Sequence, residues 1–436
     1  MESKKLLREF IQYVTLNVCG MIGLSCYILA DTFFIAQGLG ADGLAALNIA
    51  IPVYSFIHGS GLMLGMGAAT KYSIFRGQDK QEQSDSTFSN ALCLTAIGAA
   101  IFVFMGIFLS GIITAILGAD SSIFTMTKTY LQILLLFAPA FLLNDLLICF
   151  VRNDGNPGLS MAAMITGSLA NIVLDYIFIF PLQMGILGAV LATGCAPIIS
   201  VCVLSKHWVA RQNHFHMRRL ALSANLTKTT LSLGIPSLIT EIASGIVMIA
   251  FNFIILGLQG NIGVAAYGIV ANLSLVVISI YTGTAQGMQP IASRAYGLGK
   301  KEEIRKILRY AIITILLISA CAYAALLLND TFIVGLFNSE RDIQLQEIAE
   351  SGLILYFTAI PFAGFNIVLS TYFTSTEKAL PAQAVSLARG FFFLVPIAFL
   401  LSHFFHMTGV WLSYPITECS VSVLGAVLYY KCGKLS

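Results

Sequence analysis

The chain has 436 residues, of which 57% are hydrophobic and only 10% are charged, and its formal net charge is +3. Soluble proteins carry about a quarter charged residues, so this composition excludes an ordinary soluble protein and indicates a chain embedded in a lipid bilayer. Apolar stretches of roughly 20 residues, the length that spans a bilayer, recur along the whole sequence and leave no room for a soluble domain.

Charged residues, glycines and prolines divide the apolar sequence into twelve predicted helices. They cover residues 10–38, 44–75, 88–117, 123–151, 158–181, 187–210, 226–256, 262–297, 302–328, 344–374, 380–402 and 406–431. The sequence therefore predicts an all-α polytopic membrane protein with twelve transmembrane helices. An even number of spans puts both termini on the same side of the membrane.

Lysine and arginine gather in every second connection between these helices. The basic residues of that side are Lys4, Lys5, Arg8, Lys71, Arg76, Lys80, Arg152, Lys206, Arg211, Arg218, Arg219, Lys228, Arg294, Lys300, Lys301, Arg305, Lys306, Arg309, Lys378, Lys431 and Lys434. The opposite connections carry only Lys128 and Arg341, near their edges. Because basic loops stay in the cytoplasm, both termini are predicted to be cytoplasmic, with the protein in the plasma membrane.

The two halves of the chain resemble each other at an offset of about 220 residues. The matching pairs are "FFIAQGLGADGLAALNIA" (33–50) with "FIILGLQGNIGVAAYGIV" (253–270), "RGQDKQE" (76–82) with "YGLGKKE" (296–302), and "MGILGAVLAT" (184–193) with "MTGVWLSY" (407–414). Each half has six helices and begins inside, so the halves are predicted to be parallel repeats, residues 1–218 and 219–436. Such duplicated bundles favour a central cleft and rocking between two open states, which a channel or a receptor does not need.

Four polar residues lie at similar depth inside predicted helices of the first half. They are Asp31, Asn171, Asp175 and Thr193, and Asn171 and Asp175 lie one helical turn apart. A carboxylate within the hydrocarbon layer needs a cation, a proton or another carboxylate beside it. The cluster therefore suits either a sodium ion held by Asp31, Asn171 and Asp175 or a shared proton. The alternative is a polar contact that only holds helices together.

The second half has its own charges within the membrane, Glu241, Arg389 and Glu418. They are predicted to meet near the midplane, either as a cavity wall that attracts cationic substrates or as an Arg389–carboxylate pair that only fixes helix packing.

Two glutamines and one aspartate complete the buried polar set. Gln286 and Gln289 lie on a helix rich in small residues, where they either line the cleft or hydrogen-bond neighbouring helices. Asp145 lies two turns from the inner surface with Arg152 nearby, and it is expected to be structural.

Several segments together resemble the multidrug and toxic compound extrusion (MATE) transporters, in particular the MepA-like branch. They are "LADTFFIAQGLGADGLAALNIAIP" (29–52), "RNDGNPGLSMAAMITGSLANIVLDYIFIF" (152–180), "GILGAVLAT" (185–193) and "GTAQGMQPIASRAYGLGK" (283–300). The resemblance runs from about residue 10 to 430. It implies that Asp31, Asn171 and Asp175 form the site of the coupling ion, sodium or proton, with Thr193 as a neighbour.

The sequence departs from part of the family pattern in its second half. The tenth predicted helix has no acidic residue in its interior, where some family members use an aspartate for a second cation site. Glu241 follows Pro236 more closely than the corresponding glutamate of those members. A second cation site is therefore not expected.

The leading functional prediction is a secondary antiporter that exports amphiphilic, cationic compounds in exchange for protons or sodium. It would act as a monomer in the bilayer, on small-molecule substrates, without a cofactor. One alternative is a flippase for lipid-linked precursors, which would need a more cationic cleft than Arg389 alone provides. Another is an intramembrane enzyme, but the sequence has no HExxH, GxSxG or Walker motif. Nucleic-acid binding is not expected, because the basic residues follow the membrane topology.

Overall fold

A computed structural model describes residues 2–218, 222–338 and 342–434, so Arg219, Arg341 and the predicted boundary after residue 218 lie at or outside its limits. Within these ranges every regular element is a helix. The elements are α1 (Glu2–Gly77), α2 (Gln81–Phe104), η1 (Met105–Leu109), α3 (Ser110–Ile116), α4 (Phe124–Leu136), α5 (Ala138–Asn153), α6 (Pro157–Ile179), α7 (Gly185–Leu204), α8 (Lys206–Val209), α9 (Ala224–Gly297), α10 (Lys301–Phe337), α11 (Ile343–Tyr356), η2 (Phe357–Ala359), α12 (Ile360–Ser375), α13 (Ala379–Leu387), η3 (Ala388–Phe392) and α14 (Leu394–Lys434).

Three of the longest helices contain a sharp corner at which the chain reverses. The corners are Gly40 in α1 (φ 67°, ψ −156°), Gly260 in α9 (φ 61°, ψ −152°) and His406 in α14 (φ 51°, ψ −132°). Residues with a side chain rarely adopt this conformation, which explains glycine at the first two corners and implies local backbone strain at His406.

Side-chain contacts show that the chain doubles back at these corners. The hydroxyls of Tyr27 and Tyr54 are 2.6 Å apart, although 27 residues of straight helix would separate them by about 40 Å. The ion pair between Arg389 in η3 and Glu418 in α14, 2.5 Å long, joins the segments before and after the His406 corner in the same way.

These reversals account for the number of membrane-spanning segments. The described residues contain eight helices long and apolar enough to cross a membrane, and three of them are the reversing helices. A further span is the pair α4 and α5, which is bent by 47° at Phe137. Division at the corners gives twelve crossing segments within the described ranges, in agreement with the twelve predicted from the sequence.

The backbone repeats with the same spacing as the sequence. Positions with positive φ recur in pairs 220 to 223 residues apart: Gly40 with Gly260, Asp79 with Gly299, Gly155 with Glu377, and Gln183 with His406. Each pair marks the same turn between helices in the two halves. The predicted duplication is thus present in the backbone conformation as well as in the residue pattern.

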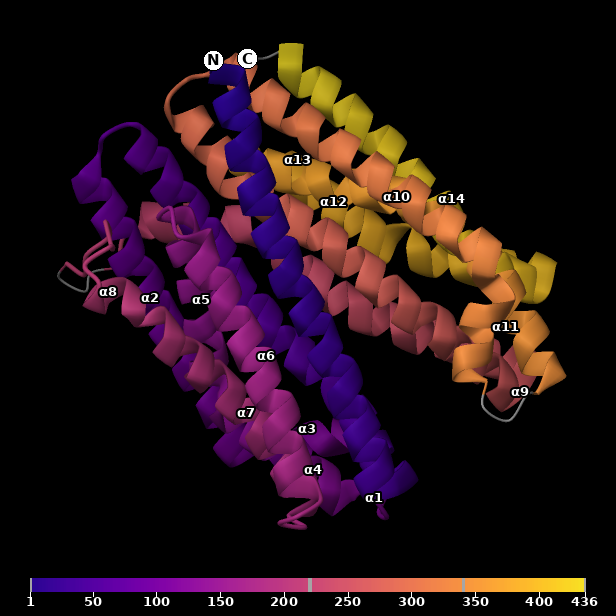
Figure 1. Cartoon of the computed structure of the whole chain (residues 1–436). Helices are drawn as coiled ribbons and strands as arrows, with labels where there is room; N and C mark the ends of the chain where they lie inside the picture. The colour runs from indigo at the N-terminus through magenta and orange to yellow at the C-terminus, as the bar shows by residue number, and fades with distance from the viewer. Residues whose placement is uncertain (1, 219–221, 339–341, 435–436) are drawn as a thin grey trace.

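The two halves form two lobes, α1 to α7 and α9 to α14, which meet at the end where both termini lie and diverge toward the opposite end (Figure 1). Glycines allow the close approach at the meeting end. A Cβ atom on Gly67 would lie 2.0 Å from the carbonyl oxygen of Thr230, and one on Gly234 would lie 1.9 Å from that of Met63. Backbone therefore packs directly on backbone between the lobes there.

Candidate functional site

A cavity of about 390 Å³ lies between the two lobes, lined by residues of α1, α5, α6, α7, α9, α11, α13, η3 and α14. Five of the predicted site residues line it: Thr193, Glu241, Gln286, Arg389 and Glu418. The other four, Asp31, Asn171, Asp175 and Gln289, are buried in the protein outside its wall. The cavity has both aromatic and charged surfaces, which suits an amphiphilic ligand.

The predicted N-lobe site residues come from three helices. Asp31 comes from the first segment of α1, Asn171 and Asp175 from one face of α6, and Thr193 from α7. Asn171 and Asp175 are completely buried, and Asp31 and Asp175 lie close enough to interact with each other. The structure thus places the two carboxylates in one buried region of the N-lobe.

Most polar atoms of this cluster have no hydrogen-bond partner among the described residues. They are Oδ1 of Asp31, both side-chain atoms of Asn171 and both carboxylate oxygens of Asp175. Burying an unpartnered carboxylate is costly, so the site requires a proton or a cation. The side chains offer oxygen atoms as ligands, and these hard ligands fit a sodium ion as well as a shared proton.

The C-lobe wall of the cavity carries a neutralised charge pair. The Arg389 Nε donates to the Glu418 carboxylate at 2.5 Å, and Asn366 donates to the same carboxylate at 2.7 Å. Arg389 lies in the π-helical turn η3, a distortion often found at functional sites. The sequence left open whether these charges form a substrate-attracting wall or an Arg389–carboxylate pair. In the structure Arg389 pairs with Glu418, and Glu241 is not part of that pair.

Glu241 faces the N-lobe instead, beside a His58–Asp145 pair that the sequence did not predict. His58 Nδ1 lies 2.9 Å from Oδ2 of Asp145, and the Glu241 side chain packs against Gly59, the residue next to His58. Asp145 was predicted to be structural with Arg152 as its neighbour. This prediction is wrong about the neighbour, because Asp145 lines the cavity and its partner is His58. The sequence did contain a signal for this pair: His58 lies within a membrane span and is followed by two small residues, Gly59 and Gly61, that allow close packing.

Arg152 is completely buried, although the charge pattern of the sequence predicts it to lie in a cytoplasmic connection between helices. Its Nη1 donates to Asn17 Oδ1 and to Gln286 Oε1, each at 2.8 Å. Asn17 belongs to the same lobe as Arg152, whereas Gln286 belongs to the other lobe and lines the cavity, so the second bond joins the two lobes.

Gln289 belongs to the same contact between the lobes and not to the cavity wall. Its Nε2 donates to Thr70 Oγ1 at 2.9 Å, and its Oε1 accepts from Asn153 at 2.9 Å. Of its two predicted roles, the structure therefore places Gln289 in helix–helix contact.

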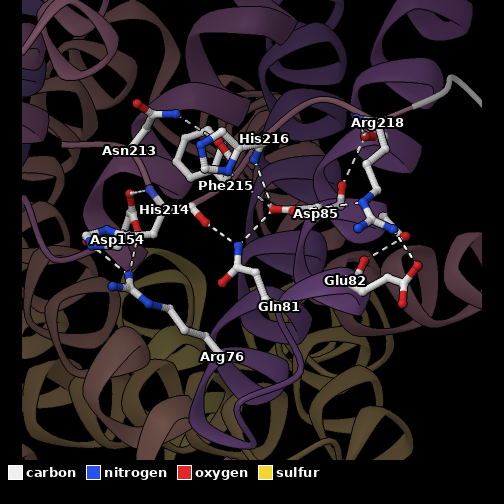
Figure 2. A network of polar contacts seen from close by, with 12 residues as sticks. Arg76, Gln81, Glu82, Asp85, Asp154, Asn213, His214, Phe215, His216 and Arg218 are labelled. Carbon is white, nitrogen blue, oxygen red and sulfur yellow. Dashed lines mark hydrogen bonds and ion pairs between the residues drawn. The ribbon is translucent and has the colours of Figure 1, made fainter. Parts of the chain in front are cut away.

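The linker that follows α8 is anchored to the N-lobe by two aspartates (Figure 2). Asp154 accepts from Tyr72 at 2.6 Å, from His207 at 2.8 Å and from the His214 backbone at 2.8 Å, and it also pairs with Arg76. Burial raises the pKa of Asp154, but these hydrogen bonds and the Arg76 charge outweigh it and hold that pKa below its ordinary value.

Asp85 anchors the next part of the linker, and the Phe215 side chain holds the linker in place between Asp154 and Asp85. Asp85 accepts from the His216 backbone at 3.0 Å, and Phe215 is completely buried against Phe88 and Phe150. These contacts hold the connection between the lobes against the end of the N-lobe where the termini lie.

Comparison with known proteins agrees with this architecture. The profile of the MatE family matches residues 18–177 and 236–400, which is more than half of the chain. The chain is 22% identical over 98% of its length to "Multidrug export protein MepA" of Staphylococcus saprophyticus, of which it covers 94%. It is 25% identical over 92% of its length to the protein of the same name from Staphylococcus aureus strain MSSA476, of which it covers 88%.

A solved structure has the same fold. An "Outward-facing conformation of a multidrug resistance MATE family transporter of the MOP superfamily" superposes with a TM-score of 0.90 at 23% identity, covering 97% of this chain and 96% of the other. The family match, the twelve crossing segments and the duplicated lobes agree with one another. The chain is a multi-pass membrane protein that belongs to the MatE family of transporters and resembles its MepA members.

Proposed function

We propose that the protein exports amphiphilic organic cations in exchange for protons or sodium ions. The observation that carries the proposal is the buried Asp31, Asn171 and Asp175 cluster with unpartnered oxygens, next to a cavity between two lobes. An ion entering the cluster changes its charge, and the lobe arrangement that binds the ion more tightly is then favoured. The relatives named as multidrug export proteins support export as the direction.

The same reasoning gives the expected orientation. The lobes meet at the end with the termini and most of the basic residues, so the meeting end is proposed to be cytoplasmic, with the cavity opening outward in the plasma membrane. Tags at the termini and within 212–217 should react only from inside, and tags within 329–338 only from outside. External labelling of 212–217 in intact cells would contradict this topology.

A flippase for lipid-linked pyrophosphates is less well supported. Such a substrate needs a cationic wall, but Arg389, the arginine that lines the cavity, is already paired with Glu418. The remaining charged cavity residues are mainly acidic, which favours a cationic substrate.

The direct test is transport in proteoliposomes. The purified protein would be reconstituted with ethidium, a fluorescent monocation, and proton and sodium gradients would be imposed separately. We expect ethidium movement driven by one of the gradients and lost in Asp175→Asn. No gradient-driven movement under either condition would overturn the proposal.

A further inference from the structure

The cavity contains a second group of ionisable side chains apart from the Asp31 cluster. It consists of His58 on α1, Asp145 on α5 and Glu241 on α9, all of which line the cavity. The His58–Asp145 contact of 2.9 Å is formed within the N-lobe, whereas Glu241 approaches from the C-lobe. The group therefore spans the cavity at the place where the lobes face each other.

Two glycines next to His58 make this approach possible. A Cβ on Gly59 would lie 3.0 Å from the Cβ of Glu241, and a Cβ on Gly61 would lie 2.4 Å from the carboxylate of Asp145. A side chain at either position would push the acidic residue away. The backbone beside His58 is thus in close contact with both acidic residues.

The charges of this group do not balance. Glu241 has no hydrogen bond or ion pair from its carboxylate among the described residues, and its side chain packs against Gly59, next to His58. Across the cavity Arg389 and Glu418 neutralise each other. Two carboxylates therefore face a single group that can carry a positive charge, the His58 imidazole.

Aromatic rings complete the surroundings of this group. The Tyr54 ring stacks on the His58 ring with centroids 5.9 Å apart, and its hydroxyl bonds that of Tyr27 at 2.6 Å. Both tyrosines line the cavity. Aromatic faces beside carboxylates form the kind of surface that binds organic ammonium and phosphonium groups.

We propose that His58, Asp145 and Glu241 form a cation-binding subsite in which the positive group of the substrate replaces the proton carried by His58. When the cation enters, it pairs with the carboxylates of Asp145 and Glu241. The imidazolium then loses its proton to the cavity water, so that the site exchanges one positive charge for another. The cation and the imidazolium compete for the same Asp145 carboxylate, and two positive groups side by side at that carboxylate repel each other at low dielectric.

This inference rests on the proposed transport of organic cations and adds a second point of proton exchange to it. It predicts that binding a permanent cation, which carries no titratable proton, releases a proton from the protein. It also predicts tighter binding as the pH rises, because the neutral imidazole no longer competes.

The experiment uses the full chain in nanodiscs and tetraphenylphosphonium, a permanent monocation. Binding and proton release would be measured by calorimetry in buffers of different ionisation enthalpy between pH 5 and 9. We expect wild type to release up to one proton, and His58→Gln to bind without release and with a flat pH profile. His58→Lys, which keeps a positive charge, should weaken binding about tenfold or more at every pH. His403→Gln, a change at an exposed histidine on α14, is the matched control.

The same measurement identifies each way of failing. We expect Asp31→Asn to release the proton as wild type does. If Asp31→Asn instead lost the proton release while His58→Gln kept it, the proton would come from the Asp31 cluster, and the proposed subsite would be overturned. Binding of equal strength in wild type and His58→Lys would also overturn it. Absence of any tetraphenylphosphonium binding or ethidium transport by wild type would instead refute the proposed function itself. Thermal stability of each variant confirms that it is folded.

Discussion

Arg152 on α5 donates a hydrogen bond to Gln286 on α9 across the interface between the lobes, at 2.8 Å. The arginine is completely buried, and among the described residues its contacts are with neutral side chains: Asn17, Gln286, Met66 and Cys149. A buried charge held only by neutral acceptors depends on their geometry. The contact between the two lobes therefore supplies part of the hydrogen bonding that this arginine needs.

Replacing this arginine should loosen the end of the molecule where the lobes meet. Arg152→Gln removes a charged hydrogen bond between the lobes worth about 1.5–3 kcal/mol, so the lobes should separate more often at this end. Spin labels at the exposed Gln78 and Leu298, on the turns that follow α1 and α9, would report longer distances. As a control, Arg309→Gln, a change at an exposed arginine, should leave the distribution of spin-label distances as in wild type. A wild-type distance distribution in Arg152→Gln would show that this bond does not hold the lobes together.

A steric wedge at the same interface should act in the same direction. A side chain on Gly234 would collide with the Met63 carbonyl oxygen, 1.9 Å from the position of its Cβ atom. Gly234→Val should therefore prevent this closed contact and abolish ethidium transport while the protein still inserts in the membrane. Gly268→Val is the control, because its Cβ would have no neighbour within 4 Å. Normal transport by Gly234→Val would show that the contact is not needed in the cycle.

The unpartnered carboxylates of the N-lobe should be required for ion coupling. Asp31→Asn or Asp175→Asn removes the charge that a proton or sodium ion would neutralise, so gradient-driven export should fall to background. Folding should be unaffected or improved, because a buried unpartnered charge is removed. Transport assays with thermal unfolding would test both statements, with the exposed Asp42→Asn as control. Full efflux by either variant would leave the cluster with a packing role only.

The two cavity glutamates should respond differently to neutralisation. Glu241→Gln should weaken binding of a monocation more than that of a neutral analogue and leave stability unchanged, because no partner loses its ion pair. Glu418→Gln should lower stability by up to about 3–5 kcal/mol, since it leaves the partly buried Arg389 without its carboxylate. Binding measurements alongside thermal unfolding would separate the two, and equal loss of both ligands in Glu241→Gln would contradict this assignment.

The linker should detach from the N-lobe when Asp154 loses its charge. Because the pKa of Asp154 is lowered in the folded protein, its stabilisation is complete above the ordinary carboxyl pKa and is lost as the pH falls through the lowered value. Asp154→Asn should remove that stabilisation at neutral pH as well. Hydrogen exchange over residues 207–218 would then be faster in the variant, whereas unchanged exchange would show that Phe215 and Asp85 suffice to hold the linker.

Much of the architecture could be predicted because its signals are local in the chain. The apolar runs and the basic connections follow directly from the solvent that each segment meets, and the 220-residue offset places Gly40 and Gly260 at equivalent corners. Asn171 and Asp175 share a helix face by their spacing alone. That Asp31 joins them was implied by the family resemblance, and the fold brings the two carboxylates together.

The partners of the remaining charges were decided only by the tertiary structure. Which residue faces Asp145, Arg152 or Glu418 depends on how each helix is rotated, on close packing at glycines and on the π-helical turn that carries Arg389. Those features arise when helices from distant parts of the chain pack against one another. Composition and spacing therefore determine that these groups are buried, whereas the packing of the two lobes selects the hydrogen bonds that stabilise them.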